Sequence, residues 1–261
     1  MIGNKEVQTY ARGDVPREAM DLAVQRVRSL LRLAPEPVLF ARVKLTLATD
    51  PAVEHPAIAQ ANVDLGGRLI RAQATGETMR EAIERMGDRL SLQMERVARN
   101  WAAIRGSQPV AQPAEWRHQS LPAPRLPYYP RPLEERAVIR RKSYALACQT
   151  VDEAVADLEL LDYDFHLFTE KATSEDSVVY RTPDGYRLAQ ARSRPHRPIT
   201  ADVPITISEH PAPRLAAHEA ITRLEALGQT FLFFVNSQTS RGNLIYHRYN
   251  GHYGLITPAA P

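Results

Sequence analysis

Four arginines recur on one side of a predicted helix that spans residues 78–104. Arg85, Arg89, Arg96 and Arg99 fall within an arc of roughly 80° beside the apolar face, and Leu92 is the one interruption. A row of guanidinium groups about one helical turn apart matches the phosphates of a nucleic-acid groove. The acidic side chains of the same helix allow a second interpretation, a solvated face held by ion pairs.

Further basic residues lie on predicted strands. Alternation in segment 38–48 places Leu39, Ala41, Val43, Leu45 and Leu47 on one side and Phe40, Arg42, Lys44 and Thr46 on the other. The same alternation puts Arg12, with Tyr10, and Arg71, with Gln73, on the polar side of neighbouring strands. Together with the helix, this basic sheet face favours nucleic-acid binding.

The sequence lacks several motifs that commonly mark the active sites of enzymes. The sequence contains no P-loop, no Gly-x-Gly-x-x-Gly after a strand, no Gly-x-Ser-x-Gly and no His-Glu-x-x-His. His247 and His252 lie close together, but a metal site needs further ligands. We therefore expect no enzymatic activity, no cofactor and no metal.

The elements that position the basic residues read β-α-β-β-β-α over residues 1–105. The first helix follows Asp14 as N-cap, with Pro16 in its first turn, and has one apolar face. The second helix has a similar apolar face. We predict a four-stranded sheet with both helices on one side, which leaves the basic side uncovered.

The C-terminal half contains an internal repeat at an offset of 66 residues. Residues 150–168 align without gaps on 216–234, Ser177–Arg181 matches Asn243–His247, and Asp184-Gly185 falls on Asn250-Gly251 as a hairpin turn. Each copy predicts a small β-α-β-β-β unit, so the whole chain is α+β. A unit of roughly 55 residues has a marginal core and an unpaired sheet edge, so we expect the copies to pair with each other. The residues expected at this pairing are Phe165, Phe168, Val179, Tyr180, Phe231, Phe234, Ile245 and Tyr246.

Proline and charge divide the chain further. Seven of its 20 prolines fall between residues 106 and 137, and three lie in 191–204, which predicts linkers in both places. The predicted parts are a binding domain (1–105), a linker (106–137), tail repeat 1 (138–190), a linker (191–204) and tail repeat 2 (205–261). Residues 1–105 carry 16 Lys and Arg against 13 Asp and Glu, whereas 138–190 carry 6 against 10. This asymmetry indicates an anionic partner for the N-terminal part.

Segment 59–90 resembles the N-terminal domain of ribosome hibernation promoting factors and ribosome-associated translation inhibitors, in its strand, glycine turn, strand and Met-x-x-Ala-Ile helix start. Residues 153–168, 178–180 and 250–256 resemble the tail of the long form of that family. The double tail is similar to the stress- or dormancy-linked form of high-GC Gram-positive bacteria.

The resemblance implies a hibernation factor that binds 16S rRNA in the small subunit, within the mRNA channel and the tRNA A and P sites, and inhibits translation on the 70S ribosome. By position it assigns rRNA contacts to Arg89 and Arg96; Leu92 stands where the family usually has a basic residue. The tail is expected to form an intrachain pair in a monomer rather than a homodimer, without joining ribosomes, and could contact ribosomal proteins.

No apolar run approaches the roughly 20 residues that cross a bilayer, and the N-terminus lacks a secretory h-region, so we expect a cytoplasmic protein without a membrane partner. A different class remains open: a general RNA- or DNA-binding regulator whose tail is a protein-interaction module.

Overall fold

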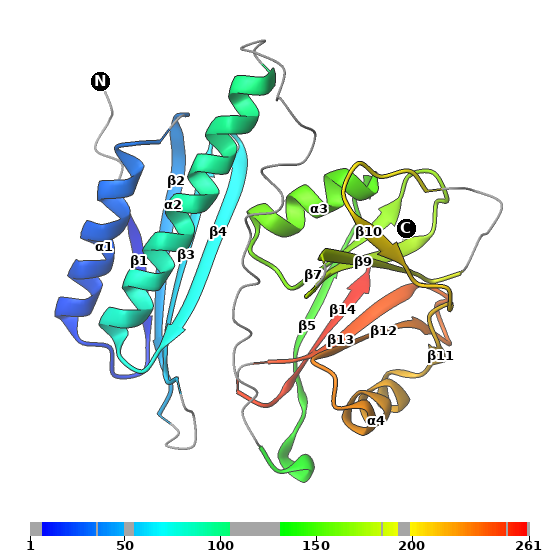
Figure 1. Cartoon of the computed structure of the whole chain (residues 1–261). Coiled ribbons are helices and arrows are strands. Elements are labelled where there is room, and N and C mark those ends of the chain that lie inside the picture. The colour runs from blue at the N-terminus through cyan, green and yellow to red at the C-terminus, as the bar shows by residue number, and fades with distance from the viewer. Residues whose placement is uncertain are drawn as a thin grey trace. The chain divides into compact units, whose positions relative to one another are not determined.

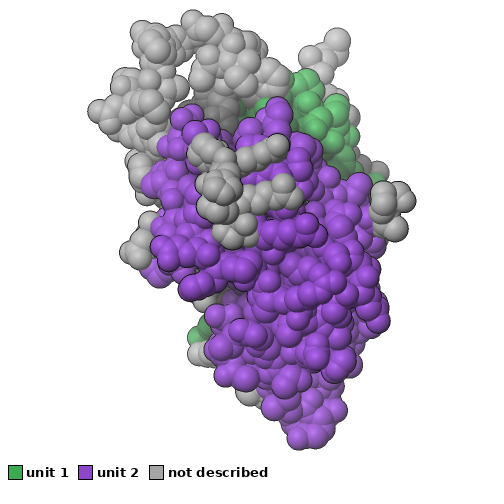
Figure 2. Space-filling model, turned by 90° about the vertical axis from the view of Figure 1, so that its right-hand side faces the viewer, with its two compact units in different colours: residues 1–116, 159–162 green, residues 117–158, 163–261 purple. Residues whose placement is uncertain are grey.

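The computed structural model describes residues 7–34, 36–49, 55–104, 131–183, 185–192, 199–248 and 250–259, with the backbone alone in 99–104. The chain divides into two compact units, residues 1–116 with 159–162 and residues 117–158 with 163–261 (Figure 2). We call β1 to α2 the N-terminal domain and β5 to β14 the tail. The predicted linker 106–137 lies outside the described residues as far as 130, as do residues 193–198 of the second linker.

The N-terminal domain is a four-stranded sheet with two helices on one face (Figure 1). Its elements are β1 (Gln8–Arg12), α1 (Arg17–Leu31), β2 (Val38–Leu47), β3 (Ala57–Leu65), β4 (Arg68–Gly76) and α2 (Met79–Ile104). The strands lie in the order β1-β2-β3-β4; β1 is parallel to β2, and the other pairs are antiparallel. The element order is the predicted one, and the α+β class is confirmed.

One apolar core joins the helices to the sheet. Ala23 and Val27 of α1 and Ile83, Met86 and Leu90 of α2 are fully buried against the aliphatic side of the strands. Burial of such a side chain contributes roughly 1.5–3 kcal/mol, so this face holds the sheet and fixes which side of it stays polar.

The start of α1 differs from the prediction. Pro16, not Asp14, is the N-cap residue, and no side chain caps the helix. The extended backbone of Pro16 (φ −58°, ψ 140°) lets its carbonyl accept hydrogen bonds from the N–H groups of Ala19 and Met20, at 3.0 and 3.3 Å. The preceding turn depends on Gly13 (φ 83°), where a Cβ would lie 2.2 Å from the carbonyl oxygen of Leu47.

Strand β2 corrects a second prediction. Leu39 is 52% exposed instead of lying on the covered face, and Val38 packs against the core in its place. The cause is a register shift between Val38 and Phe40 in the pairing with β3, which reverses the alternation at this end of the strand. From Ala41 onward the predicted alternation holds, with Ala41, Val43 and Leu45 buried.

The tail contains two five-stranded sheets. The first has the order β10-β9-β8-β7-β6 and the second β11-β12-β13-β14-β5. The bounds are β5 (Val138–Tyr144), β6 (Cys148–Gln149), α3 (Val151–Leu160), β7 (Phe165–Glu170), β8 (Asp176–Thr182), β9 (Gly185–Gln190), β10 (Ile205–Ile207), β11 (Arg214–Leu215), α4 (Ala217–Leu227), β12 (Phe231–Asn236), β13 (Gly242–His247) and β14 (Tyr253–Pro258), with a 3-10 helix at Leu133–Glu135.

Each predicted repeat gives a strand to the sheet of the other repeat. Strand β5 begins the first predicted repeat but pairs in parallel with β14 of the second sheet. Strand β10 begins the second predicted repeat but pairs in parallel with β9 of the first sheet. The predicted boundaries, 138–190 and 205–261, therefore cut across both sheets, because sequence pattern locates strands but does not choose their partners.

The second predicted linker also takes part in the packing. Ile199, Ala201 and Val203 pack into the core beneath α3, and Val203 is only 3% exposed. The backbone N–H groups of Asp202 and Val203 donate to the carboxylate of Asp152 at 3.1 Å. Residues 199–204 thus attach β10 to the first repeat instead of acting as a spacer.

The two sheets pack face to face, and α3 and α4 cover the outer faces (Figure 1). One cluster lies under α3 and includes Phe168 and Val179; another lies under α4 and includes Phe234 and Ile245. The cluster between the sheets contains buried Leu167, Val178, Phe233, Val235, Leu244 and Ile256.

The offset of 66 residues between the repeats changes at the hairpin that joins β8 to β9 in the first repeat and β13 to β14 in the second. Arg181 pairs with Tyr186 in the first sheet, whereas the corresponding His247 pairs with Tyr253 in the second. The second pair encloses one more residue, so the predicted match of two identical hairpin turns is wrong. Sequence alignment without gaps could not detect this insertion, because both turns contain glycine.

Candidate nucleic-acid interface

The predicted basic residues of the sheet gather on the face opposite the helices. Strand register places Gln8, Arg42, Asn62 and Arg71 in one row across β1 to β4, and Tyr10, Lys44, Gln60 and Gln73 in the next. We call these two rows, together with Arg12, the polar face. Arg12, Arg42 and Lys44 are all exposed. Three cations on adjacent strands can meet neighbouring phosphates of one nucleic-acid chain.

Arg42 is held by aromatic side chains on two strands. Its guanidinium carbon lies 5.2 Å from the ring centroid of Tyr10 and 4.9 Å from that of Phe40. An Nη2 donor also reaches Oε1 of Gln8 at 3.3 Å. These contacts orient the guanidinium group and leave an exposed ring, Tyr10, beside it (51% exposed). A cation next to an exposed aromatic ring suits an unpaired base and its phosphate.

The arginines of α2 are joined to the edge of the sheet. Because β4 is an edge strand, its outward carbonyls need partners other than β3. Arg85 donates to the carbonyl oxygen of Thr75 at 3.1 Å, and Arg89 donates to that of Gln73. On the same strand, Arg71 donates to the side-chain oxygen of Gln73. The row of arginines on α2, which we call the helix row, therefore adjoins the polar face at β4, and Arg89 also has an ion pair with the carboxylate of Asp162 at 3.3 Å.

The remaining residues of the helix row follow the predicted geometry to different extents. Arg96 lies in α2 seven residues after Arg89, on the same side of the helix. Leu92 is 52% exposed and interrupts the row, as the sequence indicates. Arg99 is also in α2, but its side chain lies outside the described residues. Arg85 has a 2.6 Å ion pair with Glu81, and its side chain remains 52% exposed.

The residues predicted to pair the tail repeats divide into two groups. Phe165, Tyr180, Phe231 and Tyr246 pack at the cluster between the sheets. Phe168, Val179, Phe234 and Ile245 instead lie beneath α3 or α4, in the cores of their own repeats. Strand alternation explains the error: residues one or three apart in a strand point to opposite faces, so Phe165 and Phe168 cannot share one. The same rule would have found Leu167 and Phe233, which the prediction missed.

The two histidines considered for a metal have other contacts. His247 Nε2 lies 3.6 Å from Oε1 of Glu225, and Nδ1 of His252 accepts from the backbone N–H of Ala137 at 3.2 Å. Glu225 also accepts two hydrogen bonds from Arg136 at 2.6 Å and one from Tyr253. Within the described ranges, no group of three or more His, Cys, Asp or Glu is placed to hold a metal.

This cluster shifts several pKa values. Burial raises the pKa of Glu225, but hydrogen bonds from Tyr253 and Arg136 outweigh burial and hold it below its ordinary value. Burial also lowers the pKa of His247. Burial and the bond to Glu225 raise the pKa of Tyr253 to about 12. The arrangement stabilises an ionised Glu225 and a neutral His247, which is a structural role.

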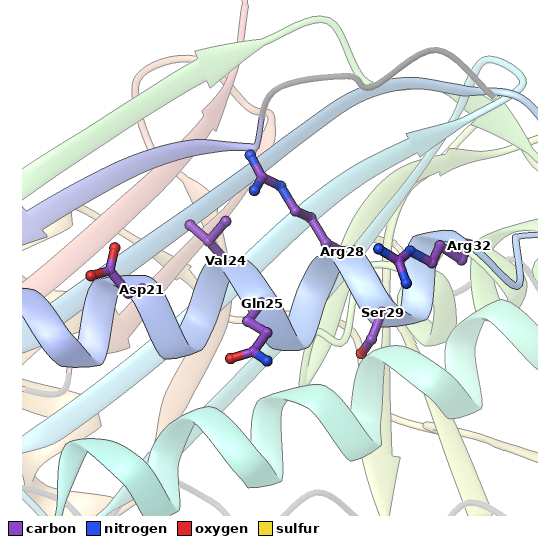
Figure 3. A pocket seen from close by; sticks show the side chains of 6 residues that line it. All are labelled: Asp21, Val24, Gln25, Arg28, Ser29 and Arg32. Carbon is purple, nitrogen blue, oxygen red and sulfur yellow. The ribbon is translucent and has the colours of Figure 1, made fainter.

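A shallow hollow on α1 lies apart from the polar face. It is lined by Asp21, Val24, Gln25, Arg28 and Ser29 of α1 and by Arg32, the C-cap residue of that helix (Figure 3). It contains none of the predicted site residues. Among the described helices, none has both the length and the apolar character needed to cross a membrane.

The structure is that of an α+β protein with one polar, arginine-bearing sheet face and a tail of two repeats. The model of the family described as Sigma 54 modulation/S30EA ribosomal protein C terminus matches residues 133–188 and 205–255. The dormancy associated translation inhibitor of Mycobacterium tuberculosis (strain H37Rv) is 36% identical over 234 residues, which cover 84% of this chain and 76% of that protein. The chain therefore belongs to the family of ribosome hibernation promoting factors and dormancy-associated translation inhibitors.

Two further comparisons concern shorter regions. The ribosome hibernation promotion factor of a Picosynechococcus species is 28% identical over 155 residues, covering 58% of this chain and 78% of that protein. The crystal structure of the Thermus thermophilus Protein Y N-terminal domain is 25% identical, with a TM-score of 0.30, over 36% of this chain and 99% of that one.

Proposed function

We propose that this protein is a ribosome hibernation factor whose N-terminal domain binds the small ribosomal subunit and inhibits translation. The observation that carries the proposal is the polar face, where Arg12, Arg42 and Lys44 are exposed on adjacent strands in a member of this family. Similarity to proteins named translation inhibitor and ribosome hibernation promotion factor supports it.

The rRNA contacts that we propose come from two elements of the N-terminal domain. They are Arg12, Arg42, Lys44 and Arg71 on the sheet and Arg85, Arg89, Arg96 and Arg99 on α2, where Arg96 also has a 2.8 Å ion pair with Glu159. The bonds of Arg85 and Arg89 to β4 carbonyls hold part of this surface in place before binding, so less conformational entropy is lost when rRNA is bound. We propose that this surface occupies the mRNA channel and the tRNA A and P sites of idle 70S ribosomes and stabilises them.

The tail has a separate role in the proposal. Its two repeats pair within one chain, so the bound factor is a monomer and does not join ribosomes into dimers. Two features support this pairing. The cluster between the sheets buries apolar side chains of both repeats, and the exchange of β5 and β10 adds a paired strand to each sheet. The outer surface of the tail is then available for ribosomal-protein contacts.

A competition assay tests the binding part of the proposal. Labelled protein is incubated with small subunits and with an equal mass of protein-free 16S rRNA, over a range of salt concentrations. Both should show salt dependence, because both present phosphates. A hibernation factor should prefer assembled subunits by at least ten-fold at physiological salt. Equal affinity for free rRNA would instead establish a general RNA-binding regulator.

A further inference from the structure

The two tail repeats face each other across a pseudo-two-fold axis. Phe165 and Phe231 occupy equivalent positions, 66 residues apart, and their ring centroids are 5.0 Å apart. Two further contacts are reciprocal. The ring centroids of Phe165 and Tyr246 are 5.4 Å apart, and those of the equivalent residues, Phe231 and Tyr180, are 5.2 Å apart. Such reciprocity characterises an isologous interface, in which identical units would make each contact twice.

One pair of equivalent positions breaks this symmetry. Asp176 begins β8 of the first repeat, and its equivalent in β13 is Gly242; the residue before each is Glu175 and Arg241, respectively. Arg241 donates to Asp176 twice, from Nε at 2.8 Å and from Nη2 at 3.1 Å. The backbone N–H of Gly242 donates to the same carboxylate at 2.7 Å.

The geometry of this contact requires both residue types. Asp176 is 8% exposed, so its charge is largely removed from water and depends on its partners. A Cβ on Gly242 would lie 2.7 Å from the Cβ of Asp176 and 2.9 Å from the ring of Phe233. A side chain at position 242 would therefore push the carboxylate away from the N–H group that it accepts from.

Pairing between like repeats would lose this contact. Applied to two copies of the first repeat, the same symmetry would bring Asp176 against Asp176 and Glu175 of the other copy, which places carboxylates together. Applied to two copies of the second repeat, it would place two Arg241 side chains near each other without an acid. Like charges in a poorly solvated site repel strongly, so both alternatives are disfavoured.

We propose that the two repeats are a complementary pair that recognises the unlike repeat and rejects its own copy, and that the contact of Asp176 with Arg241 and Gly242 is the determinant. This inference rests on the proposed intrachain pairing and names what enforces it. A tail of two identical repeats could pair with any neighbouring chain in either register, whereas this tail has one favourable partner, which the same chain supplies at high effective concentration.

The test uses the full chain, because β5 and β10 prevent either repeat from being separated with its sheet complete. The variants are Asp176→Asn, Arg241→Gln and the double variant, with Arg223→Gln on the exposed side of α4 as matched control. Calorimetry measures the Tm of the tail, and sedimentation velocity at rising concentration measures self-association.

The wild type and Arg223→Gln should share one Tm and sediment as monomers. Arg241→Gln should lower the tail Tm by about 5 °C or more, because it leaves Asp176 buried without its counter-charge, and it should produce chain dimers at high concentration because repulsion between second repeats is removed. Asp176→Asn should also lower the Tm of the tail. The Tm decrease in the double variant should be smaller than the sum of the decreases in the two single variants, because neither charge is left without its partner.

The outcomes separate the two proposals. A monomeric wild type whose single variants match Arg223→Gln in Tm and sedimentation would overturn the complementary-pair inference and leave the proposed function intact. A wild type that is dimeric at every concentration would overturn the intrachain pairing. In that case, additive Tm losses in the double variant would overturn the inference as well, and coupled losses would support recognition of the unlike repeat between chains.

Discussion

The N-terminal domain and the tail treat the two faces of a sheet differently. In the N-terminal domain, both helices pack on one face, and Arg42 and Lys44 remain exposed on the other. In the tail, each sheet has a helix on one face and the other sheet on the opposite face, so both sides are buried. A sheet covered on one side retains a surface for a partner, whereas a sheet covered on both sides uses its residues for stability.

Charge is distributed in accordance with this difference. On the polar face of the N-terminal domain, the cations stand beside amides and aromatic rings, as Arg42 does with Gln8 and Tyr10. In the tail, ionic groups are matched internally, as Arg136 is with Glu225 and Arg241 with Asp176. Cations of the first kind are suited to binding an external anion, and those of the second kind specify the fold.

The largest expected effect is the loss of ribosome binding when the polar face is reversed in charge. Arg42→Glu with Lys44→Glu removes two phosphate contacts and adds repulsion, so we expect affinity for small subunits to fall by about 100-fold or more. Both side chains are exposed, so circular dichroism should show an unchanged fold. Arg223→Glu, at an exposed position on the tail, serves as the charge-reversal control, and binding that survives in the double variant would exclude the polar face from the interface.

A substitution that creates a cavity between the tail sheets should lower the stability of the tail and leave binding to small subunits intact. Phe233 is 6% exposed within the cluster that joins the sheets. Phe233→Ala should lower the free energy of unfolding of the tail by about 3–5 kcal/mol. Chemical denaturation followed by hydrogen exchange would locate the loss. A variant with normal tail stability would contradict the assignment of this cluster as the tail core, and an equal loss of affinity for small subunits would contradict the division of roles.

Acid should weaken the tail through Glu225 and His247. Both pKa values are lowered in the folded chain, so the unfolded chain binds more protons as the pH falls. The stabilisation is complete above pH about 6.5, declines first as unfolded His247 becomes protonated, and declines further as the pH falls below about 4.5 through the lowered pKa of Glu225. Calorimetry from pH 7.5 to 4 should show a falling tail Tm.

Glu225→Gln is the control for the acid effect. It leaves the guanidinium of Arg136, whose side chain is 9% exposed, without its counter-charge, so the tail Tm should fall at neutral pH. The same variant should lose the part of the pH dependence that lies below about 4.5. A Tm that depends on pH in the same way with and without Glu225 would exclude this carboxylate as the source.

The smallest effect is expected at the edge of the polar face. Arg85→Ala removes one exposed cation together with its hydrogen bond to the carbonyl of Thr75. Affinity for small subunits should fall several-fold, and the slope of log affinity against log salt should decrease by about one, as for the loss of a single phosphate contact. An unchanged slope would mean that Arg85 serves only to cover the edge of β4.

Periodicity predicted the side of each strand but not the partner of each strand. Ala41, Val43 and Leu45 point to the core as alternation requires, and the polar face follows directly from this. Leu39 departs from the pattern because a register shift depends on how β2 meets β3. The exchange of β5 and β10 could not be predicted from periodicity for the same reason, because strand pairing is decided by contacts between segments far apart in the chain.

The candidate site was predictable where it depended on local geometry. The arc of Arg85, Arg89 and Arg96 follows from helical spacing alone, whereas the bonds of Arg85 and Arg89 to β4 depend on the strand order. In the tail, equivalent positions identified the repeat, but Asp176 and Gly242 became informative only when the structure brought them into contact. Their difference in the aligned sequences was visible, and its meaning required the pseudo-two-fold axis.

Ribosome binding by this protein is tested most directly by sucrose-gradient sedimentation of purified bacterial ribosomes with the protein at physiological salt, with every fraction blotted for it. We expect the wild type to migrate with small subunits and 70S ribosomes without producing a ribosome-dimer peak, while the Arg42→Glu, Lys44→Glu variant stays at the top. Wild-type protein that stays at the top of the gradient would contradict the proposed ribosome binding, and a ribosome-dimer peak would contradict the intrachain pairing of the tail.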